Sequence, residues 1–189
     1  MPGIGFILLN GGFLIIVVCF LICGIISYVI KTANALTRLK NKVKELDSDV
    51  DAALTKRYDL LQKQYSAVKM YCAHESSTLM ETIRLRNGMS GNEKSEVSNK
   101  LDRLSKQLRV TMEAYPELRS SEQVTMLQHS CDNAEEHLQA ARRLYNTGVT
   151  NYNNMCAQFP SSMVASLTGH RQAEYFKADE GKRSDVEFS

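Results

Sequence analysis

The sequence predicts an all-α protein: an antiparallel, up-and-down helical bundle that follows an N-terminal transmembrane helix. Its 23 basic and 21 acidic residues all come after residue 30 of the 189-residue chain. The remainder has few of the glycines and prolines that interrupt helices. Its apolar residues recur at steps of three and four, which is the period of an amphipathic helix. These patterns exclude an ordinary water-soluble globule and argue against sandwich, barrel and βαβ architectures.

A short tail, residues 1–5, precedes a predicted membrane anchor at residues 6–30. The anchor has 25 residues without a charged side chain. At about 1.5 Å per residue it exceeds the roughly 30 Å hydrocarbon core of a bilayer. A cleaved signal peptide is the competing interpretation, because the segment is N-terminal. It fits less well, since no Lys or Arg precedes the apolar run and no small-x-small cleavage site follows it.

Basic residues predict the orientation of the anchor. Five of them follow it before the first acidic residue: Lys31, Arg38, Lys40, Lys42 and Lys44. Positive flanks stay on the cytoplasmic side of a membrane. We therefore expect a single-pass protein with the bulk of the chain in the cytoplasm.

The remainder predicts three long helices of matched length. They cover residues 31–73, which continue the anchor, then 76–115 and 117–159. Equal helices joined by short turns favour an up-down-up bundle. The glycines of residues 87–92 interrupt the second helix, and counting that break gives four helices.

Prolines and the C-terminal pattern predict where the bundle ends. Pro116 separates the second helix from the third, and Pro160 stops the third. A short amphipathic turn follows before Gly169. The predicted bundle domain is therefore residues 31–168, and residues 169–189 form a C-terminal tail.

Four segments carry a family resemblance that covers nearly the whole chain. In order and spacing they resemble the LemA family of bacterial membrane proteins: RYDLLQKQYSAVKMYCAHES (57–76), EAYPELRSSEQV (113–124), ARRLYNTGVTNYNNMCAQFPSSMVASLTG (141–169) and FKADEGKRSDVEFS (176–189). The resemblance implies a helical bundle on a single span of the bacterial inner membrane, and a family whose molecular activity is not established. The chain departs from the family in having Leu60-Leu61-Gln62-Lys63 where a Pro is usual, and Ala52-Ala53 where a Trp is usual.

Polar side chains gather on one face of the third predicted helix. A Tyr-Asn pair recurs after seven residues, which returns both pairs to the same side, and an Arg lies three residues before the first pair. Such a face serves either as a hydrogen-bond network between helices or as a docking face for a peptide or partner helix. Asp59 and Glu75 are candidate acidic counterparts. The candidate partner face is Arg142, Tyr145, Asn146, Tyr152 and Asn153.

Metal and cofactor sites are not expected. None of the four histidines has another at the three- or four-residue spacing that helical metal ligands need. Asp47, Asp49 and Asp51 alternate by two and so are predicted to point around the helix. HExxH, CxxC, GxSxG and P-loop patterns do not occur.

Three cysteines fall on apolar stripes and are expected to be small buried side chains. Cys72 and Cys156 lie at the same predicted end of the bundle, so they are the candidate disulfide if the domain faces an oxidising compartment. A cytoplasmic location argues against that bridge.

Two classes of function fit these observations. We expect a non-catalytic, membrane-anchored interaction or scaffold module, not an enzyme. The sequence does not identify its protein partners, and further copies of itself are one candidate. An accessory or regulatory subunit of a membrane enzyme, such as a protease, is the alternative. A net charge of +2 with interleaved signs does not favour nucleic acid.

Overall fold

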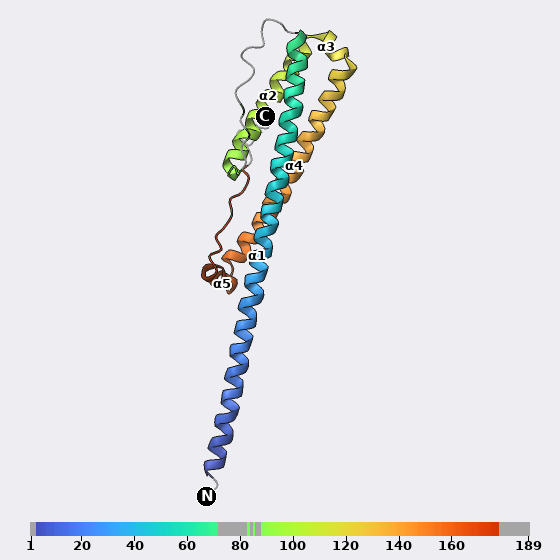
Figure 1. The fold of residues 1–189 in the computed structure, drawn as a ribbon. Coiled ribbons are helices and arrows are strands. Elements are labelled where there is room, and N and C mark those ends of the chain that lie inside the picture. The colour runs from blue at the N-terminus through green and yellow to red at the C-terminus, as the bar shows by residue number, and fades with distance from the viewer. Residues whose placement is uncertain (1–2, 72–82, 84, 86–87, 178–189) are drawn as a thin grey trace, which may run out of the picture. The chain divides into compact units, whose positions relative to one another are not determined.

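A computed structural model describes residues 3–71, 83, 85 and 88–177 (Figure 1). Within them the elements are α1 (Gly3–Tyr71), α2 (Gly91–Ala114), α3 (Pro116–Ser120), α4 (Glu122–Ala157) and α5 (Ser161–Leu167). This part of the chain contains no strand, which confirms the all-α prediction. The chain forms two compact units. Unit 1 combines Met1–Asn41 with Asn151–Gln172, and unit 2 combines Lys42–Thr150 with Ala173–Ser189.

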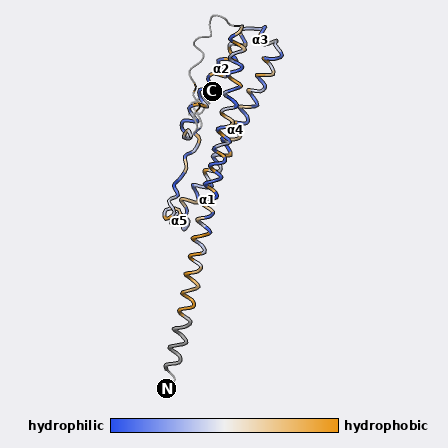
Figure 2. The backbone as a smooth tube through the Cα atoms, in the orientation of Figure 1, coloured by the Kyte–Doolittle hydropathy of each residue, from blue (hydrophilic) through white to orange (hydrophobic). Residues whose placement is uncertain are grey.

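Helix α1 runs without a break for 69 residues, as its lack of helix breakers after residue 30 predicts. Its N-terminal part is apolar over a window of mean hydropathy 2.7 (Figure 2), and no residue of that window is buried. By length and composition it is the one helix of the described residues that could cross a membrane. Farther along, the predicted apolar stripe is buried at Leu36, Val43, Leu46, Val50, Leu54, Leu61, Tyr65 and Val68.

Helix α2 begins later than the predicted helix 76–115. Ser90 accepts a hydrogen bond from the Glu93 amide, and the Glu93 carboxylate accepts one from the Ser90 amide, a reciprocal cap that starts the helix at Gly91. Ile83 and Leu85 are not helical, and the other residues of 76–87 lie outside the described part. The predicted apolar positions of α2 are buried: Val97, Leu101, Leu104, Leu108 and Met112.

Contacts within unit 2 set the directions of the helices (Figure 1). On α2, Lys94, Asp102 and Met112 contact α1 at Asp47, Arg57 and Gln64 respectively. Both series increase, so α2 runs parallel to this part of α1. Arg57 also pairs with Glu135, and Gly148 approaches Leu46, so α4 runs antiparallel to it.

The predicted up-down-up order therefore holds between α2 and α4, which run antiparallel. It differs at α1, which runs parallel to α2 and antiparallel to α4. The prediction assumed a short turn after residue 73. The cap at Ser90 instead starts α2 at Gly91, so residues 72–90 separate the two helices in sequence. A short turn cannot join parallel neighbours, because the connection must return along the length of a helix.

The third predicted helix, 117–159, is divided. Pro116 occupies the first turn of α3, Ser121 has extended backbone, and α4 starts at Glu122. Helix α4 ends at Ala157, just before Pro160 as expected, which leaves Phe159 outside the helix and 82% exposed. The buried apolar positions of α4 are Val124, Cys131, Ala134, Leu138, Tyr145, Val149 and Tyr152.

Candidate interaction surface on helix α4

Three of the five predicted face residues meet an extended segment from the C-terminal part of the same chain. Arg142, Tyr145 and Asn146 lie three and four residues apart, so α4 presents them on one side. They contact residues 173–177, which have neither helix nor strand geometry. We name these residues the C-terminal strap. All of these groups belong to unit 2.

The carboxamide of Asn146 binds the main chain of the strap at two points. Its Nδ2 donates to the carbonyl oxygen of Phe176 at 2.9 Å, and its Oδ1 accepts from the Phe176 amide, also at 2.9 Å. One side chain thus satisfies the main-chain donor and the main-chain acceptor of one residue, as a hydrogen-bonded pair of residues does in antiparallel strands. This recognition does not depend on the strap side chain.

Tyr145 and Arg142 extend the contact in both directions along the strap. The Tyr145 hydroxyl donates to the carbonyl oxygen of Glu174 at 2.9 Å, and Arg142 Nη2 donates to that of Lys177 at 3.1 Å. Burial, with smaller contributions from Asp47 and Glu174, raises the pKa of Tyr145, so its hydroxyl keeps the proton that it donates.

Phe176 is the side chain that anchors the strap. It is 2% exposed, and the Arg142 guanidinium lies 4.3 Å from its ring centroid, a cation–π contact. Burying a phenylalanine side chain stabilises by about 1.5–3 kcal/mol. An aromatic side chain therefore supplies the affinity while the polar groups fix position.

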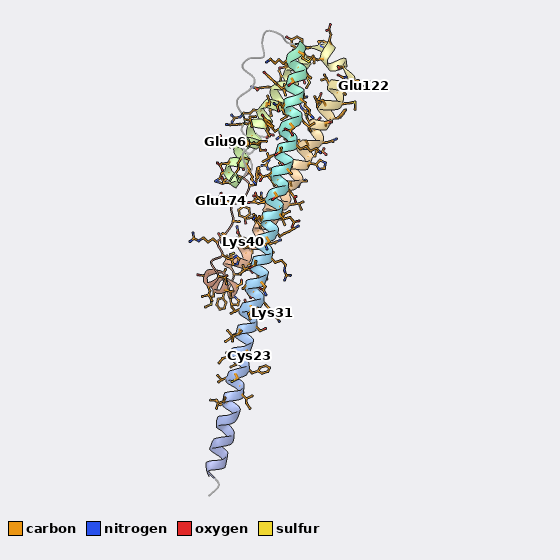
Figure 3. All side chains as sticks on the ribbon, in the orientation of Figure 1. Cys23, Lys31, Lys40, Glu96, Glu122 and Glu174 are labelled. Atoms are coloured by element: carbon orange, nitrogen blue, oxygen red, sulfur yellow. The ribbon has the colours of Figure 1, made fainter. Side chains whose placement is uncertain are left out.

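The first turn of α2 forms the opposite wall. The Lys177 amide donates to Ser95 Oγ at 3.1 Å, and Ser95 Oγ donates to the Gly91 carbonyl at 2.8 Å. A Cβ atom at Gly91 would lie 2.9 Å from the Tyr175 carbonyl oxygen, so only glycine admits the strap at this distance. Figure 3 labels one residue from each side of this contact, Glu96 on α2 and Glu174 in the strap.

The predicted counterparts of the face differ from the observed ones. Asp59 is exposed on α1, and Glu75 lies outside the described residues. Main-chain groups of the strap bind the face instead. No periodicity marks residues 173–177, so helical pattern analysis does not find them.

Tyr152 and Asn153 belong to unit 1 and do not join this contact. Both are buried, and the Tyr152 hydroxyl lies 3.1 Å from Nδ1 of His170, which is hydrogen-bonding distance. Burial and, to a smaller extent, Cys156 raise the pKa of Tyr152 to about 12. The contact between Tyr152 and His170 joins the end of α4 to the chain after α5. This is the packing role that the sequence offered as an alternative to docking.

Beside the strap contact, α2 and α1 share a buried cation. Lys94 is fully buried, and its Nζ lies 2.5 Å from Oδ1 of Asp47 and 2.8 Å from Oδ1 of Asp51. The interpretation of Asp47, Asp49 and Asp51 as pointing around the helix overlooked that Asp47 and Asp51 are four residues apart. That spacing places two carboxylates on one face, where they hold one ammonium.

Arg57 connects three helices. It is 4% exposed, and its Nη2 pairs with Asp102 on α2 at 2.7 Å and with Glu135 on α4. A planar guanidinium suits such shared carboxylate contacts. The role of Arg57 was not predicted from the sequence, although a basic side chain between the apolar residues Leu54 and Leu61 is a signal for it.

Cysteines and metal ligands add no further site here. Cys131 is buried, as expected, and burial, reinforced by Asp132, raises the pKa of its thiol to about 11. Cys156 is half-buried, not buried as expected, and carries a free thiol. Cys72 lies outside the described residues, so a bridge between the two stays a prediction. Among the described residues no group of three or more His, Cys, Asp or Glu side chains could hold a metal ion.

The arrangement defines a class of protein: a helical bundle with a long apolar N-terminal helix and a side-chain face that binds the main chain of an extended segment. The LemA family model matches residues 47–189, and the chain belongs to the LemA family. Protein LemA of Metamycoplasma hominis is 26% identical over 183 residues, which cover 94% of this chain and 84% of that protein.

Proposed function

We propose that this LemA-family protein is a membrane-anchored, non-catalytic interaction module whose α4 face binds extended protein segments. The observation that carries the proposal is the two-point contact between the Asn146 carboxamide and the Phe176 main chain. Because Asn146 binds main-chain atoms, the face suits partner segments of different sequence, provided that each has one aromatic side chain to take the place of Phe176. The strap then occupies the face until a partner segment displaces it.

In this proposal residues 6–30 span the inner membrane and the bundle lies in the cytoplasm. Leu14, Phe20, Ile25 and similar side chains are exposed, which is costly in water and favourable in lipid. Lys31 and Arg38 are exposed directly after this segment, and positive flanks favour the cytoplasmic side.

Topology is tested by protease access to a tag placed after Ser189. We expect protection in intact cells and in spheroplasts, and cleavage only after permeabilisation. Cleavage in intact cells or in unpermeabilised spheroplasts would place the bundle outside the cytoplasm and direct the search for partners to the cell envelope.

A non-catalytic role follows from how the buried polar groups are used. Lys94 and Arg57 form ion pairs with carboxylates of neighbouring helices, and the Tyr145 hydroxyl donates a hydrogen bond to the strap. Each of these groups is engaged by a partner inside the bundle or by the strap. A catalytic group would instead have to face a bound substrate. We therefore expect the α4 face to exchange segments without changing them.

The peptide exchange is tested with full-length protein in detergent micelles and a fluorescent peptide of residues 171–177. Phe176→Ala removes the strap's anchor, so this variant is expected to bind the peptide saturably. Adding Asn146→Asp places a carboxylate oxygen against the peptide carbonyl and should weaken binding about tenfold, which corresponds to about 1.4 kcal/mol.

Asn133→Asp is the matched control, because Asn133 is exposed elsewhere on α4 and should leave binding unchanged. Recovery of intact peptide, by mass spectrometry, is expected throughout. Equal binding with and without the Asn146 change would refute the α4 face as the binding site, and peptide cleavage would refute the non-catalytic role.

A further inference from the structure

Helix α5 has two apolar faces, and one of them is uncovered. Val164 and Ala165 are 5% and 2% exposed, so they pack inside unit 1. Met163 and Leu167, one turn apart, are 65% and 80% exposed, and Phe159 just before the helix is 82% exposed. Large apolar side chains that cluster on a surface mark a contact with a partner or a membrane.

The charges of unit 1 favour a membrane surface. Residues 144–169 contain no charged side chain. Unit 1 as a whole carries four basic residues, Lys31, Arg38, Lys40 and Arg171, and not one acidic residue. An apolar face with only basic neighbours is the composition that binds at the interface of anionic bilayers.

The position of α5 along α1 is that of a membrane interface. Within unit 1 the first buried side chains after the apolar segment of α1 are Thr32 and Leu36. At about 1.5 Å per residue these lie only about 3 and 9 Å beyond Ile30. In Figures 1 and 3, α5 lies at the level of the part of α1 between Lys31 and Lys40, and both belong to unit 1.

We propose that α5 and Phe159 form a second membrane contact that lies on the bilayer surface beside the anchor. Phe159, Met163 and Leu167 enter the boundary between headgroups and acyl chains, and Lys31, Arg38, Lys40 and Arg171 face anionic headgroups. The occupant is lipid, because the uncovered face belongs to the same unit as the exposed apolar part of α1 and that unit carries basic but no acidic residues. This inference rests on the proposed anchor, and its effect is to fix the rotation and tilt of α1.

The absence of tryptophan from the chain allows a direct test. Single-Trp variants of the full-length protein are reconstituted into vesicles of phosphatidylcholine and phosphatidylglycerol in which the phosphatidylcholine carries bromine at a shallow or a deep acyl position. Leu167→Trp reports on α5, and Phe159→Trp repeats the measurement. Leu21→Trp reports on the anchor, and Met126→Trp, an exposed position of α4, gives the unquenched baseline.

We expect Leu167→Trp and Phe159→Trp to lose at least half of their fluorescence, more with shallow than with deep bromine, and less in vesicles without phosphatidylglycerol. Leu21→Trp should be quenched most by deep bromine. Quenching of Leu21→Trp with both α5 reporters at the Met126→Trp baseline would overturn this inference and leave the anchor standing. An unquenched Leu21→Trp would overturn the anchor and this inference together.

Discussion

The side chain of Asn146 on α4 binds the main chain of Phe176 in both directions, donating to its carbonyl oxygen and accepting from its amide at 2.9 Å each. Thirty residues separate the two in sequence. The contact turns a helix face into a receptor for an extended segment. It also means that this face is already occupied, so any partner segment competes with the strap of the same chain.

Asn146→Asp should release the strap. The Asp side chain still accepts from the Phe176 amide, but its second oxygen faces the Phe176 carbonyl, and repulsion replaces a hydrogen bond at a cost of about 1–3 kcal/mol. We expect hydrogen exchange at the amides of Phe176 and Lys177 to become at least tenfold faster, as measured by mass spectrometry. Asn133→Asp should leave these amides protected. Unchanged protection in Asn146→Asp would show that the carboxamide does not hold the strap.

Gly91→Ala should release the strap from the other wall. The added Cβ would lie 2.9 Å from the Tyr175 carbonyl oxygen, a main-chain atom that cannot turn aside. Chymotrypsin should then cleave after Tyr175 and Phe176 several times faster. Asn92→Ala, one residue along the same turn and exposed, is the control and should cleave at the parent rate. Equal rates for the two variants would contradict the close approach.

The helices that carry these walls could be predicted from sequence because burial follows the helical period. The stripe from Leu36 to Val68 predicted α1, and the third stripe predicted the core of α4, including Tyr145. Periodicity shows which side of a helix is covered, but not which segment covers it. The strap could therefore not be predicted, since residues 173–177 are too few to show a helical or strand period and Phe176 is their only large aliphatic or phenyl side chain.

The direction of α2 relative to α1 could not be predicted, for a related reason. Its apolar stripe fits either direction, and the ion pairs that select one join Lys94 to Asp47 and Arg57 to Asp102 across more than forty residues. A buried cation is a strong constraint once its partner is known, because an unpaired charge in a protein interior is costly. Sequence alone does not assign the partner.

The Lys94 cluster predicts an asymmetry between its two sides. Asp47→Asn with Asp51→Asn leaves a fully buried ammonium without a countercharge, and we expect a loss of about 3–5 kcal/mol in the free energy of unfolding. Lys94→Met leaves carboxylates that are 38% and 37% exposed and can still contact water, so its loss should be smaller.

Urea titration of the detergent-solubilised protein, followed by circular dichroism, measures both variants. Lys106→Met, an exposed position on the same helix, should lie within about 0.5 kcal/mol of the parent. If Lys94→Met lowers the free energy of unfolding as much as the double Asp change does, the cost of an unpaired buried ammonium does not explain the stability of this cluster.

Cys131 predicts a loss of stability at alkaline pH. Burial, with Asp132, raises its pKa from 9.0 to about 11, so the folded protein keeps the thiol proton where the unfolded chain has lost it. Unfolding then releases a proton, and the free energy of unfolding falls as pH rises from about 9 to about 11, by at most about 3 kcal/mol in total. Below pH 9 this contribution is fully present.

Cys131→Ala removes the titrating group and should flatten the fall, although the smaller side chain lowers stability at every pH. Urea titrations at half-unit pH steps compare the slopes, with Cys23→Ala on the exposed apolar part of α1 as the control that keeps the parent slope. Parallel curves for Cys131→Ala and the parent would show that the buried thiol does not control this transition.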